Sequence, residues 1–78
     1  RKQLKPLQDK IKKIERELEK LQHQDLQMQY ALQDQSLYDD KEKLQQTLLE
    51  HYNLKGKIEE IELDWFVALE ELDSINQN

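Results

Sequence analysis

The stretch that decides the fold runs from Leu4 to Leu21 and reads LKPLQDKIKKIERELEKL. Its apolar side chains recur at alternating steps of three and four residues, the spacing of a heptad seam along one face of an α-helix. The same steps continue to Leu32. We therefore predict a first helix over about residues 4–33, with this seam: Leu4, Leu7, Ile11, Ile14, Leu18, Leu21, Asp25, Met28 and Leu32.

A second stretch with the same alternation fills the other half of the chain. Between the two stretches the period breaks, and turn-forming and N-cap residues are frequent. Asp39 followed by Glu42 fits a capping box, so we expect Asp39 to cap the second helix. These signals predict a turn over about 34–39 and a helix over about 40–76, with the seam Leu44, Thr47, His51, Leu54, Ile58, Ile61, Trp65, Ala68, Leu72 and Ile75.

Two amphipathic helices joined by a short loop favour an antiparallel hairpin. One alignment places apolar residues on both sides of nearly every layer. The predicted fold is therefore all-α, a single antiparallel two-helix coiled-coil hairpin over residues 1–78, about 45 Å long at the helical rise per residue. Its layers are Leu32/Leu44, Met28/Leu48, Leu21/Leu54, Leu18/Ile58, Ile14/Ile61, Ile11/Trp65, Leu7/Leu69 and Leu4/Leu72.

The composition excludes several classes of protein. The chain has 78 residues, of which 37% are charged, with one glycine and no cysteine. Disulfides, thiolate metal sites and glycine-rich phosphate loops are therefore excluded, and no apolar run approaches the length of a membrane span. A hairpin this small has no deep interior, so we predict that it is not an enzyme and holds no cofactor or metal. Arg1 suggests a fragment of a longer protein.

Charge is distributed unevenly between the two helices. Residues 1–20 carry eight basic and four acidic side chains, whereas residues 58–78 carry seven acidic ones and no lysine or arginine. An antiparallel hairpin lays these segments side by side. Exposed ion pairs contribute only tenths of a kcal/mol each, so the pattern selects the orientation more than it adds stability.

Two polar residues, Asp25 and His51, fall in one layer of the continuous seam. Paired there, they could fix the register. Alternatively, a four-residue stutter near Leu21 would bring Leu26 and Tyr30 inward and turn both polar residues to solvent. We favour the stutter because aspartate is rarely buried.

Two surfaces are candidates for binding. The outer face of the first helix carries a basic stripe that could track a phosphate backbone, although composition alone favours an ordinary solvated helix face. The residues of the stripe are Lys5, Lys12, Lys13, Arg16 and Lys20. The second helix carries apolar residues away from its seam, which indicates a partner surface unless they wrap the base of the hairpin; they are Leu49, Tyr52, Leu63, Phe66 and Val67.

Two sequence motifs suggest a family. The turn Ser36-Leu37-Tyr38-Asp39 follows a helix that begins with the proline–leucine pair at Pro6, and the second helix ends in the run Trp65-Phe66-Val67 with an acidic, leucine-rich continuation. Together they resemble the C-terminal coiled-coil domain of ABC-F ATPases of the Uup and YheS types. The resemblance covers nearly the whole chain.

This resemblance implies a cytoplasmic protein without a membrane-spanning part, whose parent chain binds ATP and Mg²⁺ in two ATPase domains and acts on ribosomes. The hairpin itself is then a non-hydrolysing accessory domain that contacts ribosomal RNA, tRNA or DNA. An alternative role is an arm that docks on the ATPase domains of its own chain or forms a homodimer. Because the second helix is acidic, any nucleic acid should contact the first helix.

Overall fold

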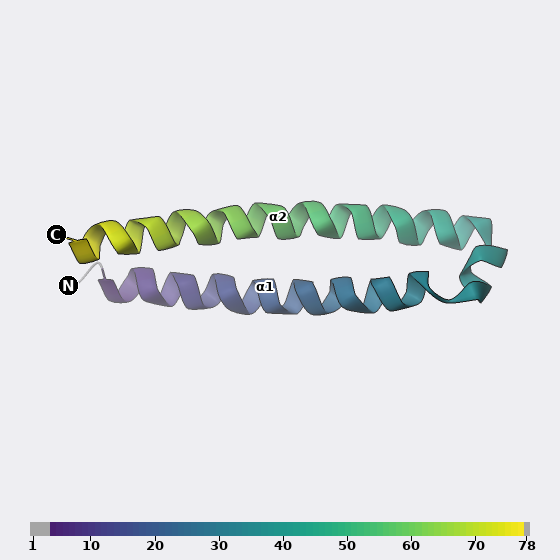
Figure 1. Cartoon of the computed structure of the whole chain (residues 1–78), viewed down its shortest axis with the longest axis horizontal. Coiled ribbons are helices and arrows are strands. Elements are labelled where there is room, and N and C mark those ends of the chain that lie inside the picture. Colours follow the sequence, from purple (N-terminus) through teal and green to yellow (C-terminus); the bar gives the residue numbers. More distant parts are fainter. Residues whose placement is uncertain (1–3, 78) are drawn as a thin grey trace.

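The computed structural model describes residues 4–77, which form two long helices joined by a short one. Helix α1 spans Leu4–Leu32, the 3₁₀ helix η1 spans Gln35–Asp39, and α2 spans Lys41–Gln77. The long helices run antiparallel, with the start of α1 and the end of α2 at one end and η1 at the other (Figure 1). The all-α hairpin predicted from the sequence is therefore confirmed.

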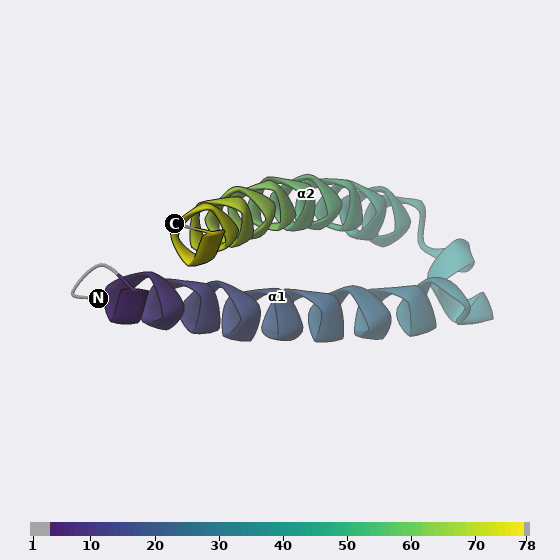
Figure 2. The ribbon, with the colours of Figure 1, turned by 60° about the vertical axis from the view of Figure 1, so that its left-hand side comes forward.

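The molecule is a rod with a long axis of 59 Å and a width of 14 Å. The expected length of about 45 Å was too short, because α2 alone has 37 residues and η1 extends the end of the hairpin. Seen from a second direction, α2 still lies beside α1 over their shared length (Figure 2). Within residues 4–77, no helix is both long and apolar enough to cross a lipid bilayer.

The base of the hairpin holds its best-packed cluster. Leu7, Ile11 and Ala68 are buried there, and Ala68 is only 1% exposed. Trp65 is half-buried and packs against this cluster, as the predicted Ile11/Trp65 layer requires. The remaining half-buried side chains around the cluster are Ile14, Leu69, Leu72 and Ile75.

The seam of α1 continues toward the turn without a stutter. Leu26 and Tyr30, which a stutter would bury, are 46% and 64% exposed, whereas Asp25 and His51 are half-buried between the helices. The stutter interpretation was therefore wrong. The physical reason is that Asp25 and His51 are hydrogen-bonded to each other, so the seam can hold both without leaving either polar group unpaired.

One predicted layer near the turn is also wrong. Leu48 is 49% exposed and therefore lies outside the buried seam, whereas Met28 is half-buried. The half-buried residue at this level of α2 is Thr47, whose hydroxyl donates a 2.8 Å hydrogen bond to the Lys43 carbonyl. Because the hydroxyl is paired within its own helix, threonine can occupy a seam position.

Local hydrogen bonds define the turn. The Asp34 carboxylate accepts from the backbone N–H of Ser36 at 3.0 Å and from its hydroxyl at 2.9 Å. These bonds hold the pKa of Asp34 below its ordinary value of 3.8. Leu37 is buried beneath the turn, and the Tyr38 hydroxyl donates a 2.6 Å bond to the Leu32 carbonyl at the end of α1.

The N-cap of α2 is Asp40 and not Asp39 as predicted. The Asp40 carboxylate accepts from the backbone N–H of Lys43 at 3.2 Å, and its backbone has an extended conformation. Asp39 is the last residue of η1. Because Asp39 is part of the 3₁₀ helix, the next residue, Asp40, caps α2 in its place.

Candidate nucleic-acid interface

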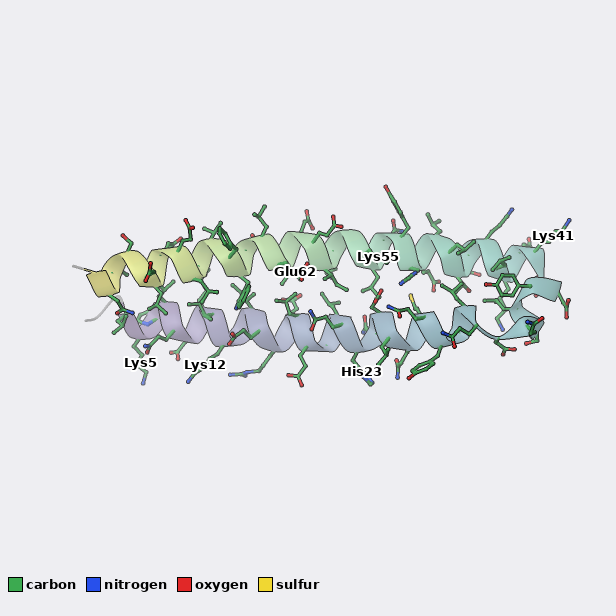
Figure 3. The ribbon with its side chains drawn as sticks, in the orientation of Figure 1. Lys5, Lys12, His23, Lys41, Lys55 and Glu62 are labelled. Carbon is green, nitrogen blue, oxygen red and sulfur yellow. The ribbon has the colours of Figure 1, made fainter. Side chains whose placement is uncertain are left out.

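All five basic residues predicted on α1 are exposed, but the structure divides them between two sides of the helix. Lys13, Arg16 and Lys20 line a shallow groove where α1 meets α2. Lys5 and Lys12 do not line it, and both project from α1 away from α2 (Figure 3). A single stripe of five cations, as the sequence suggested, is therefore replaced by a cluster of three and a separate pair.

Helix α2 contributes a fourth cation, Lys57, which the sequence analysis missed. In an antiparallel coiled coil, each g position, which directly precedes an a position of the seam, faces a g position of the other helix. Lys57 directly precedes the seam residue Ile58, so the alignment of the helices could have revealed it. We call this surface the basic groove; its lining is Lys13, Arg16, Glu17, Lys20, Leu21, Gln24 and Lys57.

The basic groove concentrates positive charge within a short length. Lys13 and Lys20 are seven residues apart, about 10 Å along the axis of α1. Glu17 is the one carboxylate in the lining and is outnumbered by four cations. Long cationic side chains that are exposed and close together suit the phosphates of a nucleic-acid backbone, which are recognised without regard to base sequence.

The opposite side of the hairpin has the reverse charge. There Glu15 and Glu19 of α1 and Glu62 of α2 surround an apolar floor that contains Trp65 and Phe66. The indole Nε1 of Trp65 donates a 3.2 Å hydrogen bond to the Glu15 carboxylate. We call this surface the acidic groove. Because its carboxylates repel phosphate, the acidic groove is the less favourable side for a nucleic acid.

The half-buried polar pair sits between the helices, nearer to the turn. His51 Nε2 and Asp25 Oδ1 are 2.6 Å apart, and the two side chains are 13% and 18% exposed. The other carboxylate oxygen of Asp25 accepts a 2.7 Å bond from Gln29 Nε2. Neither His51 nor Asp25 lines the basic or the acidic groove. The hydrogen bond between them links α1 to α2 at this level of the hairpin.

Among residues 4–77, no three histidine or carboxylate side chains are close enough together to hold an ion. His23 lies on the exposed side of α1, where its ring contacts Gln27 at 3.3 Å, and it projects away from α2 (Figure 3). His51, by contrast, belongs to α2 and bonds to Asp25 between the helices.

The apolar residues predicted to form a partner surface on α2 are exposed. Tyr52 is 75% exposed and Leu63 is 63% exposed, although both are large apolar side chains on a well-formed helix. The alternative, in which Phe66 and Val67 wrap the base of the hairpin, does not hold, since these side chains are 55% and 49% exposed. Leu49, at 60% exposed, completes this set.

Comparisons with protein-family models, with curated proteins and with solved structures give no match to this chain.

Proposed function

We propose that this hairpin is an accessory coiled-coil domain of an ABC-F ATPase and that its basic groove binds the phosphate backbone of ribosomal RNA or another nucleic acid. The observation that carries the proposal is the convergence of Lys13, Arg16, Lys20 and Lys57 from two helices on one groove. ATP and Mg²⁺ belong to the ATPase domains of the parent protein, so the hairpin contributes binding and not hydrolysis.

The residues behind the family resemblance have specific places in the hairpin, which supports the proposal. Leu37 is buried under the turn and Tyr38 bonds to the last carbonyl of α1. Trp65 packs on the cluster at the base. The motif residues therefore shape the turn and the base of the hairpin.

Binding to a short duplex at low salt, followed by fluorescence anisotropy, tests the proposal. The variant Lys13→Glu/Lys20→Glu reverses two charges in the basic groove. Its matched control, Lys41→Glu/Lys43→Glu, changes the net charge equally at exposed positions outside the groove. We expect the groove variant to lose binding and the control to keep most of it, with helicity unchanged in both. Equal binding by the two variants would contradict the proposal.

A second candidate function, a protein-docking arm, is favoured by the exposed apolar residues of α2. Leaving Leu63 and Phe66 in water is unfavourable, so a surface that covers them gains free energy. The ATPase domains of the same protein are one candidate partner. Salt distinguishes the two functions, because phosphate binding weakens steeply with added salt and apolar docking does not.

A further inference from the structure

Helix α2 carries a second heptad seam that the hairpin leaves uncovered. From Leu49 to Phe66, the residues on this face alternate in steps of three and four, as in the seam that packs on α1. Its four apolar members are between 55% and 75% exposed. We call this face the α2 stripe; it consists of Leu49, Tyr52, Gly56, Glu59, Leu63 and Phe66.

We propose that a second copy of this chain covers the α2 stripe, with the two α2 helices antiparallel around a twofold axis between residues 57 and 58. In this alignment every large apolar residue of the stripe meets another. Leu49 packs on the partner's Phe66, and Tyr52 packs on the partner's Leu63. Symmetry repeats both layers at the other end, so the apolar contacts extend over about 26 Å of helix.

The flank of the stripe beside the acidic groove fits the same alignment. Lys55 faces the partner's Glu62, which gives two opposite-charge pairs by symmetry, and Leu48 faces the partner's Leu69. A parallel pairing in register would instead bring Glu59 against its own copy within the stripe. Like charges in facing positions disfavour that arrangement, so the charge pattern of α2 selects the antiparallel dimer.

Gly56 supplies an independent argument for a close neighbour. Glycine is unfavourable inside a helix, and a Cβ built at Gly56 would meet no atom within 4 Å. Packing within the hairpin therefore gives no reason for glycine. In the proposed dimer, Gly56 lies opposite the partner's Glu59 at the centre, where the missing side chain leaves room for the glutamate stem.

The proposed dimer goes beyond the proposed function and is compatible with it. The stripe lies toward the acidic groove, since Phe66 belongs to both surfaces. Lys57 and the other cations of the basic groove line the opposite side of the hairpin. A dimer formed through the stripe thus leaves two basic grooves open, one on each copy.

Sedimentation of the 78-residue chain over a range of micromolar concentrations tests the association. We expect a monomer–dimer equilibrium that Leu63→Ser/Phe66→Ser weakens by about tenfold or more, as truncation of central apolar contacts does. The matched control is Leu26→Ser/Tyr30→Ser, which removes exposed apolar groups from α1 and should leave the dimer intact. A strict monomer at high micromolar concentration would overturn the proposal and leave docking within the parent protein.

Cysteine crosslinking tests the alignment, and the chain has no cysteine to interfere. We expect Leu49→Cys and Phe66→Cys chains to form a disulfide when mixed and oxidised. Neither variant should crosslink efficiently alone, because the two copies of either position are about 25 Å apart in the antiparallel dimer. Efficient crosslinking of each variant with itself would show a parallel dimer and refute the proposed alignment.

Discussion

The polar pair between the helices permits a sharp test of how the register is fixed. In His51→Leu, the Asp25 carboxylate keeps its bond from Gln29 but loses its partner across the seam. A partly buried polar group left without its partner costs about 1–3 kcal/mol. Because the Asp25 side chain is 18% exposed and water can reach it, we expect a cost near the lower end of that range. Asp25→Leu should cost a similar amount by stranding the imidazole.

The double variant Asp25→Leu/His51→Leu has the opposite expectation. It replaces the polar layer with two apolar side chains, and replacing a buried ion pair in this way is often neutral or stabilising. We therefore expect the double variant to be at least as stable as the natural chain, although each single variant is less stable. The changes in the free energy of unfolding caused by the two single variants then do not add up to that of the double variant, as is typical of residues in direct contact.

Urea and thermal unfolding followed by circular dichroism measure these differences. In a domain of this size, 1 kcal/mol shifts the melting temperature by about 4–8 °C. The matched control is Asp9→Leu and His23→Leu, the same residue types at exposed positions of α1. If both single variants of the pair behaved like this control, or if their effects simply added, the pair would not hold the register.

Three further predictions concern single positions. Trp65→Ala should cost about 3 kcal/mol in urea unfolding, because it empties a half-buried site on the base cluster; an unchanged midpoint would contradict the Ile11/Trp65 layer. At low concentration Gly56→Ala should stabilise the monomer by about 0.5–1 kcal/mol, since its Cβ meets nothing within 4 Å, while sedimentation should show a weaker dimer. Because the pKa of Asp34 is lowered in the folded state, its ionised carboxylate stabilises the fold above pH 3.8. This stabilisation is lost as the pH falls through the lowered pKa of the folded state. Melting curves of Asp34→Asn should lack this loss.

The spacing of apolar residues predicted most of the fold. Apolar residues that recur in steps of three and four lie on one face of a helix, and packing that face against a second such helix buries them. The region around Asp25 could not be predicted from single residues. Aspartate alone is unfavourable in a seam, and only its partner on the other helix makes the position acceptable. The cap was missed for a related reason, since Asp39 and Asp40 are both suitable N-caps and η1 decides between them.

The candidate site was predicted in part. Composition showed that α1 is basic, but the division of its cations depends on their angle around the helix relative to α2. Lys12 and Lys13 are adjacent in sequence, yet only Lys13 lines the basic groove. Lys57 lies on α2, so only the alignment of the two helices places it beside the cations of α1.

The most direct test of the phosphate-binding proposal is the salt dependence of duplex DNA binding. If the four cations of the basic groove each contact a phosphate, log Kd should rise with log salt with a slope of about 3.6. Between 50 and 200 mM salt, affinity should then fall about 150-fold. The double variant Lys13→Glu/Lys20→Glu should show a slope of about 1.8 or less. Binding by the natural chain that did not change with salt would contradict the proposal.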